Sequence, residues 1–327
     1  MSGNARVPVG RTAHARTAGL YRRHEALSTG ISDDEIRRRC LGGSWRRVHR
    51  GAYAESAMMA GLDAVARHRL RVAALIPAMA DEAVVSHQSA AVLLGAPMAP
   101  ALLDRVHVTR NRRHGGRIKA NVKVHCAPVD CVVELDGLLV TSPARTVVDL
   151  ARTAAFEPAV VVADALGRQF GITAGELDAE LELARRRRGI DAARRVVDFL
   201  DPRSGGVDQS RVRAALPRLG LPPAEAGGVV HTEDGQALGT VDLYLGQTGV
   251  VLIVDPPPGT RRDPVPTETV LRRHRFQPVR TTWRELSAGV STARLRTALI
   301  ASREQPPRGF IRPAPLPEHV SLPRRSL

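Results

Sequence analysis

The sequence is poor in the residues that mark several classes of protein. Its three cysteines (Cys40, Cys126 and Cys131) are too few for the disulfide framework of a small secreted domain, which favours a reducing cytoplasm. Aromatic residues make up only 3% of the 327 residues, so the cores must be built mainly from Ala, Val and Leu. No apolar run approaches the roughly 20 residues of a membrane-spanning helix, and no signal-peptide pattern is present. We therefore expect a cytoplasmic protein without a membrane partner.

Lysine is nearly absent too, yet the chain is strongly basic. Its 48 Lys and Arg residues, of which only Lys119 and Lys123 are lysines, exceed its 33 Asp and Glu residues and give a net charge of +15. Residues 1–53 hold 11 arginines against four acidic residues, a local charge of +7. Such a local excess is expected of a surface that binds a polyanion, although charge alone does not distinguish DNA from RNA or an anionic membrane.

The motifs of common enzyme classes are also missing. There is no Walker A loop and no Gly-x-Gly-x-x-Gly fingerprint, so no cofactor is expected. Ser86 and His87 are adjacent, and because adjacent residues of a helix point apart, they are not expected to form a catalytic pair. His125, Cys126 and Cys131 lack both a fourth ligand and the spacing of a zinc finger. Core or surface positions are the favoured interpretation of these three residues.

A helix–turn–helix pattern is present at residues 21–41. Ala26, Gly30 and Ile36 stand where the motif needs a small residue, a turn glycine and a core aliphatic residue. A capping box at residues 32–35 is predicted to start the second helix, and glycines 42–43 to end it. Ile36 and Cys40 are expected to face inward. This leaves two arginines toward solvent or a DNA groove: Arg37 and Arg38.

A β-hairpin is predicted directly after the second helix. Trp45, Val48 and Tyr53 supply apolar anchors, and Gly51 supplies the turn. Basic side chains surround that turn and are expected to contact phosphates or a minor groove: Arg46, Arg47, His49 and Arg50. Residues 18–56 are therefore predicted to form a winged helix-turn-helix that binds DNA, preceded by a disordered basic arm at residues 1–17.

The stretch 30–53 resembles the N-terminal domain of AbiEi-type antitoxins of bacterial type IV toxin–antitoxin systems. Segments 85–91, 106–109 and 140–150 are similar to the actinobacterial branch of that family. The resemblance covers residues 19–200. It implies a transcriptional repressor that binds double-stranded DNA at its own promoter, with an α/β middle domain at residues 60–200. It names a nucleotidyltransferase-like toxin as a candidate genetic partner without requiring one.

Two helices of the middle region carry readable signals. Pro143 is expected at the first position of a helix in which Arg145 and Asp149, four residues apart, can pair. A capping box at residues 173–176 is predicted to open a second helix that runs into four arginines at 185–188. Those arginines either complement the helix dipole or contact DNA, and the first interpretation is favoured.

The C-terminal region, residues 207–303, resembles the Vsr-like (very-short-patch-repair) branch of nucleases with the restriction-endonuclease fold. The matching landmarks are residues 201–204, 210–213, 220–223, 241–243 and 283–286. Residues 201–206 are expected to link this domain to the middle domain. The resemblance implies carboxylates that converge on Mg²⁺ and a basic or amide group beside the attacking water.

This chain departs from the nuclease pattern where the metal would bind. Gln209 and Val254 occupy positions where active relatives carry Glu, and prolines 256–257 occupy the place of the lysine. Asp242, joined at best by Asp255, is left as a vestigial metal ligand. We therefore predict no metal and an inactive domain, in which Asp242 accepts hydrogen bonds from nearby backbone or an arginine.

The expected fold class is α+β and multidomain, with a winged helix-turn-helix, an α/β middle domain, a restriction-endonuclease-like α/β domain and a disordered tail at residues 304–327. The favoured function is a DNA-binding transcriptional regulator that is not an enzyme. The alternative is a divergent metal-dependent DNA endonuclease of the Vsr-like fold that the winged helix tethers to DNA. A third hypothesis is an interaction scaffold that has lost both activities.

Overall fold

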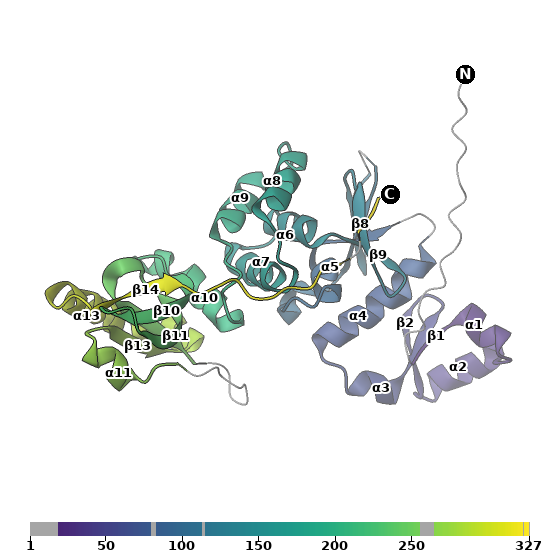
Figure 1. The fold of residues 1–327 in the computed structure, drawn as a ribbon. Helices are drawn as coiled ribbons and strands as arrows, with labels where there is room; N and C mark the ends of the chain where they lie inside the picture. The colour runs from purple at the N-terminus through teal and green to yellow at the C-terminus, as the bar shows by residue number, and fades with distance from the viewer. Residues whose placement is uncertain (1–18, 80–82, 113–114, 256–264, 323, 327) are drawn as a thin grey trace, which may run out of the picture. The chain divides into compact units, whose positions relative to one another are not determined.

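The computed structural model describes residues 19–79, 83–112, 115–255, 265–322 and 324–326. The chain divides into two compact units: the first unit (Met1–Leu93, Pro100–Ser142 and Pro323–Leu327) and the second unit (Leu94–Ala99 and Pro143–Leu322). Three sheets and many helices confirm a mixed α and β fold (Figure 1). Within the described ranges, no helix has both the length and the apolar character that crossing a membrane requires. The predicted basic arm, residues 1–17, lies outside the described residues.

The first unit opens with the predicted pair of helices and hairpin. Its first elements are β1 (Leu20–Arg22), α1 (Arg23–Ser28), α2 (Asp33–Leu41), β2 (Trp45–His49), β3 (Ala52–Glu55), α3 (Ser56–Ala60), α4 (Ala64–Leu75) and the 3-10 helix η1 (Ile76–Ala78). The strands form an antiparallel sheet in the order β1-β3-β2. Figure 1 draws α1 and α2 in purple next to it.

Two small cores hold this sheet between helices. Ala26 of α1, Ile36 of α2 and Trp45 of β2 form one core. Leu20 of β1 and Leu70 of α4 belong to another, together with the alanines of β3. Because α4 supplies part of the core, this part of the unit extends beyond residue 56, where the predicted domain ends.

A second sheet of the first unit lies between residues 84 and 141 and takes one strand from the C-terminal segment. Its elements are β4 (Val84–Val85), α5 (His87–Leu93), the 3-10 helix η2 (Pro100–Leu102), β5 (Val106–Arg110), β6 (Arg117–Ile118), β7 (Val122–Cys126), β8 (Cys131–Leu135), β9 (Leu138–Thr141) and β15 (Arg324–Ser326). The strand order is β15-β8-β9-β4-β5-β7-β6. β5 and β7 pair in parallel, and α5 packs against β5.

The second unit begins with a group of helices. They are α6 (Pro143–Ala151), α7 (Phe156–Phe170), α8 (Ala174–Leu183) and α9 (Ile190–Phe199). The predicted pair Arg145–Asp149 is confirmed at 2.7 Å between Nε and Oδ2, and both side chains are buried. The capping box of Thr173 and Glu176 is confirmed as well.

Helix α8 was expected to run into the four arginines at 185–188, but it ends before them. The helix ends at Leu183, and the chain turns at Ala184, whose carbonyl accepts a hydrogen bond from the Arg187 amide at 2.8 Å. The run therefore lies in a turn after the helix. Its last carbonyl, that of Arg188, accepts hydrogen bonds from the guanidinium of Arg152.

The rest of the second unit is a sheet covered by helices on both faces. Its elements are α10 (Val207–Ala215), the 3-10 helix η3 (Leu216–Leu219), β10 (Glu225–Thr232), β11 (Ala237–Tyr244), the 3-10 helix η4 (Gly246–Thr248), β12 (Val250–Val254), α11 (Glu268–Arg273), β13 (Gln277–Thr281), α12 (Trp283–Ser287), α13 (Val290–Glu304) and β14 (Gly309–Pro313). The strand order is β13-β12-β11-β10-β14. Only the β12–β13 pair is parallel among the pairs described in this sheet.

Strand β12 explains the apolar run at residues 250–254. Leu252 packs with Val212 of α10 and Leu295 of α13 on one face of the sheet. Ile253 packs with Leu271 of α11 on the other face. A strand buried on both faces reads as a continuous apolar stretch rather than as an alternation.

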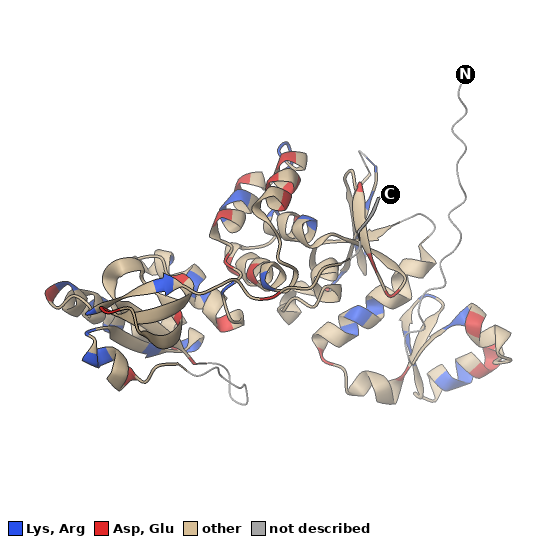
Figure 2. Cartoon of the chain, in the orientation of Figure 1, with Lys and Arg blue, Asp and Glu red and all other residues tan. Residues whose placement is uncertain are grey.

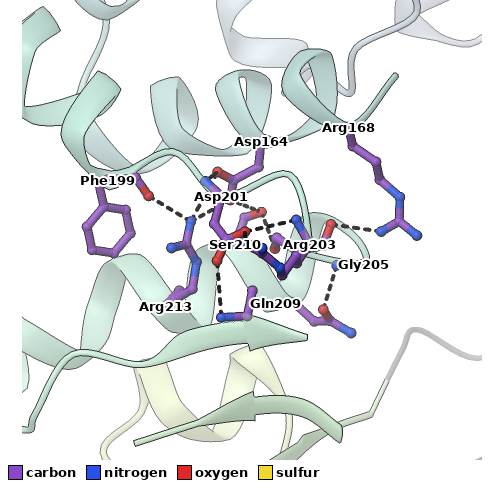
Figure 3. Close-up of polar contacts among 11 residues, drawn as sticks. Asp164, Arg168, Phe199, Asp201, Arg203, Gly205, Gln209, Ser210 and Arg213 are labelled. Carbon is purple, nitrogen blue, oxygen red and sulfur yellow. Dashed lines mark hydrogen bonds and ion pairs between the residues drawn. The ribbon is translucent and has the colours of Figure 1, made fainter. Parts of the chain in front are cut away.

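Two predictions about the ends of this region need correction. Residues 309–313 form strand β14, paired with β10, so the segment 304–327 is not a disordered tail throughout. Residues 201–206 are part of a hydrogen-bonded connection inside the second unit (Figure 3). There the carboxylate of Asp164 (α7) accepts the Asp201 amide at 2.9 Å and pairs with Arg213 (α10) at 2.9 Å. This network joins the helices before residue 200 to those after it, so the division of the chain differs from the predicted ranges 60–200 and 207–303.

Candidate functional site

The turn between α1 and α2 has the predicted geometry. Gly30 has a φ of 88°, a left-handed conformation that favours glycine. The amide of Ile31 donates to the carbonyl of Ala26 at 3.0 Å and closes the turn. Ser32 caps α2 by accepting the Glu35 amide at 3.2 Å. Only this half of the expected capping box is present, because the Glu35 carboxylate pairs with arginines of its own helix.

The exposed face of α2 carries the two arginines predicted to meet DNA. Arg37 and Arg38 are both exposed. Arg38 pairs with Glu35 at 2.7 Å, whereas Arg37 forms no ion pair with another described residue. Asp33, at the start of the helix, pairs with Arg23 of α1. Figure 2 shows the mixture of blue and red along these two helices. Of the two exposed arginines, Arg37 is therefore the one whose charge no described acidic residue neutralises.

An aromatic stack fixes α2 against the hairpin. Trp45, 4% exposed, stacks on Tyr21 with ring centroids 4.5 Å apart and on Tyr53 at 6.1 Å. The guanidinium of Arg39 lies 4.9 Å from the centre of the Trp45 ring. This cation–π contact ties the last turn of α2 to β2. The anchoring role predicted for Trp45 and Tyr53 is therefore visible in the packing.

The hairpin places most of its predicted basic residues on the surface. Arg46, Arg47 and Arg50 are exposed, and none forms an ion pair with another residue in the described ranges. His49 differs, because it is half-buried and its Nδ1 is removed from solvent. A pocket of about 520 Å³ lies beside β2 and α4. Arginines contribute to its wall: Arg47, Arg67 and Arg71.

The two vestigial metal ligands are engaged with different partners. Asp242 accepts the side-chain amide of Gln209 at 3.0 Å and the backbone amide of Val254 at 2.8 Å. The prediction that Asp242 accepts from backbone is thereby confirmed. Asp255 pairs with Arg280 of β13. Gln209 also accepts the amide of Gly205 at 2.6 Å (Figure 3), so a neutral amide bridges the place where the nuclease pattern has a carboxylate.

Three histidines that the sequence analysis did not connect converge in the first unit. They are His87 at the start of α5, His107 on β5 and His125 on β7, and one ring nitrogen of each lies within 4.8 Å of the others. His87 and His107 are buried, and His125 is half-buried. Burial, and next the positive charge that His125 can carry, lowers the pKa of His107 from 6.5 to about 3. His107 is thus a neutral imidazole at physiological pH.

The geometry at Ser86 and His87 differs from the prediction. Their side chains do not point apart, because Ser86 precedes α5 and His87 has a φ of 53°. The Ser86 hydroxyl lies 3.0 Å from Nδ1 of His87 and accepts the Thr109 hydroxyl at 2.8 Å. By contrast, no group of potential metal ligands among the described residues contains Cys126, at the end of β7, or Cys131, at the start of β8.

Comparison with known proteins gives similarity over part of the chain and no family. No family model matches the chain. The chain is similar to two uncharacterized proteins of Mycobacterium tuberculosis, one from strain CDC 1551 and one from strain H37Rv. In each case it is 32% identical over 102 residues, which is 31% of this chain and 38% of the relative. The matched region thus spans well under half the length of these relatives.

Proposed function

We propose that this protein is a cytoplasmic DNA-binding transcriptional regulator that contacts double-stranded DNA through α2 and the β2–β3 hairpin. The observation that carries the proposal is the exposed, uncompensated charge on these two neighbouring elements: Arg37, Arg46, Arg47 and Arg50. The order strand, helix, turn, helix, hairpin, with a β1-β3-β2 sheet, is that of a winged helix-turn-helix. In such domains the second helix enters the major groove and the wing contacts the backbone.

The resemblance to AbiEi-type antitoxins extends this proposal to repression of the protein's own promoter. The most direct observation is the genomic neighbourhood of the coding sequence. A nucleotidyltransferase-like toxin gene directly downstream would support an antitoxin role, and a solitary gene would favour a regulator without a toxin partner. The uncharacterized mycobacterial relatives neither add to this assignment nor oppose it.

We also propose that the C-terminal part of the second unit has a degenerate restriction-endonuclease-like fold. Its order α10, β10, β11, β12, α11, β13 supports this, as does the position of Asp242 on the middle strand β11. The engagement of Asp242 by Gln209 and of Asp255 by Arg280 argues against a working nuclease. DNA binding rather than DNA cleavage is therefore the proposed activity.

A salt titration of the full-length chain tests the proposal. Duplex DNA from its own promoter should bind with an affinity that falls steeply with salt, because each neutralised phosphate releases counterions. The triple variant Arg46→Ala, Arg47→Ala, Arg50→Ala should flatten the slope of log K against log salt by about 0.9 for each phosphate that the protein no longer neutralises. Fluorescence anisotropy with labelled duplex measures both quantities.

A matched triple variant supplies the control. Arg195, Arg296 and Arg303 are exposed arginines of the second unit, and their replacement by Ala removes the same charge. This control should leave the slope near that of the wild type. Equal reductions in affinity in both triple variants would show that net charge rather than the hairpin drives binding.

A further inference from the structure

The three histidines His87, His107 and His125 share one face of the second sheet in the first unit. β5 and β7 run parallel with His107 opposite Lys123 and Thr109 opposite His125. His107 and His125 therefore lie one diagonal step apart on the same face, because side chains alternate along a strand. Helix α5 packs against β5, and its first residue brings His87 to the same place.

The three imidazole rings lie in close contact with one another. Nε2 of His125 lies 3.3 Å from Nδ1 of His107. The rings of His87 and His125 stack with centroids 3.6 Å apart, and the remaining centroid distances are 5.2 and 5.8 Å. Zinc binds imidazole nitrogen at about 2.0–2.1 Å, so two nitrogens of a tetrahedral site are about 3.3 Å apart. The pair His107–His125 already has this separation, whereas the ring of His87, which stacks on that of His125, has to rotate to present a nitrogen to the same ion.

Hydrogen bonds with neighbouring serines hold the His87 side chain and the backbone of His107 in place. The Ser86 hydroxyl lies within hydrogen-bond distance of Nδ1 of His87. A hydrogen-bond partner on the other ring nitrogen, usually a carboxylate, backbone carbonyl or water, fixes the orientation of a metal-bound histidine, and the Ser86 hydroxyl is placed to act in the same way. The His107 amide donates to Ser89 of α5 at 2.8 Å, which ties its strand to the helix. The ligands thus come from elements bonded to each other rather than from loose loops.

We propose that His87, His107 and His125 form a binding site for one transition-metal ion, with zinc as the expected occupant. Three imidazole nitrogens match the ligand preference of zinc, and three protein ligands leave a fourth position open to water or an anion. Lys123 and Arg105 add positive charge near His107, which favours an anionic fourth ligand. The site departs from the expectation of no metal, which considered only His125 with two cysteines and the carboxylates of the second unit.

Metal binding by the untagged full-length protein tests the proposal. After removal of metal with EDTA, titration with Zn²⁺ against a chromogenic chelator should show one saturable site per chain. Co²⁺ in its place should give the intense visible absorption of a four-coordinate ion. His107→Gln and His125→Gln should each lose the site, and Ser86→Ala should weaken it about 10–100-fold. His24→Gln, an exposed histidine on α1, should bind as the wild type does.

If circular dichroism shows that the variants do not fold, a second measurement tests the proposal on the wild-type protein. In the wild type, Zn²⁺ should protect His125, the half-buried member of the cluster, from diethyl pyrocarbonate, with mass spectrometry identifying the modified residues. His24 should be modified equally with and without the ion. Absence of saturable binding, retention of the site in folded His107→Gln or His125→Gln, or a lack of protection at His125 would each overturn the proposal.

Discussion

The buried carboxylate of Asp164 accepts hydrogen bonds from two separate segments, residue 201 and helix α10. Its carboxylate accepts the Asp201 amide, the Ser210 hydroxyl at 2.7 Å and the Arg213 guanidinium, which also donates to the carbonyl of Phe199 at 3.0 Å. Taking a charge out of water is costly, so each partner of such a pair depends on the other. The Arg213 guanidinium in addition lies 4.5 Å from the centre of the Phe199 ring.

Replacing this carboxylate should destabilise the second unit strongly. Asp164→Ala leaves Arg213 buried without its counter-charge, and we expect a decrease of about 3–5 kcal/mol in the free energy of unfolding. Asp191→Ala is the matched control, because Asp191 pairs with Arg194 on the surface and exposed pairs contribute little. Urea unfolding followed by circular dichroism measures both. Similar decreases in the two variants would contradict the importance given to the buried network.

His68 should make the stability of the first unit depend on pH. Burial lowers its pKa from 6.5 to about 4, while its ring nitrogens contact Leu103 and Ser89. The unfolded imidazole takes up a proton below about pH 6.5, but the folded one does so only below about pH 4. The free energy of unfolding should therefore fall as the pH drops through this window, by up to about 3 kcal/mol for this group.

The variant His68→Gln isolates this contribution. Its urea midpoint should change less between pH 7 and pH 4 than that of the wild type. His107 acts in the same direction, so the dependence should be reduced rather than abolished. Parallel pH profiles for the two proteins would show that His68 is not the group responsible.

At the scale of helices and strands, the features set by residues close together in the sequence were predicted correctly. Features that depend on contacts between distant segments were not. The turn at Gly30, the end of α2 at glycines 42–43 and the box at Thr173 depend on residues within a few positions of each other. Strand β14 depends on pairing with β10, which lies some 80 residues earlier in the chain. The composition of the tail, rich in Pro and Arg, carries no sign of that partner. The role of α4 in the core beside β1 and β3 was missed for the same reason.

Helix α2 permits a prediction about specificity. Arg37→Ala should weaken binding to the promoter site by about 1–3 kcal/mol, with a much smaller effect on random DNA, because arginine that reads guanine discriminates by about that amount. Arg38→Ala should follow the same pattern with a smaller effect, because Arg38 already shares the carboxylate of Glu35. Competition binding with promoter and random duplexes distinguishes the effects. Equal weakening on both duplexes would assign these arginines to phosphate contacts.

At the scale of the whole molecule, we expect DNA binding without cleavage. Plasmid incubated with the full-length protein and Mg²⁺ or Mn²⁺ should remain uncut, because a metal-dependent nuclease needs several carboxylate oxygens and a group that orients water. Asp242→Ala should lower stability, since it removes an acceptor from Gln209 and from the Val254 amide. Cleavage by the wild type that Asp242→Ala and Asp255→Ala both lose would establish the endonuclease alternative instead.

The histidine cluster could not be predicted from the sequence. His87, His107 and His125 are 20 and 18 residues apart, and each belongs to a different element. Their meeting depends on the parallel pairing of β5 with β7 and on the packing of α5, neither of which a local pattern specifies. The candidate DNA interface was predictable because α2 and the β2–β3 hairpin are consecutive along the chain.

The segment after α13 supplies an outer strand to two sheets: β14 to the sheet of the second unit and β15 to that of the first. During synthesis, neither sheet has this strand until the ribosome has translated and released residues 309–326. Until then, β10 and β8 each present an edge of unpaired backbone groups, the kind of surface through which nascent chains associate wrongly. A stop codon near position 305 would remove β14 and β15 together and leave the edges of both β10 and β8 unpaired, which should favour association of the truncated chains.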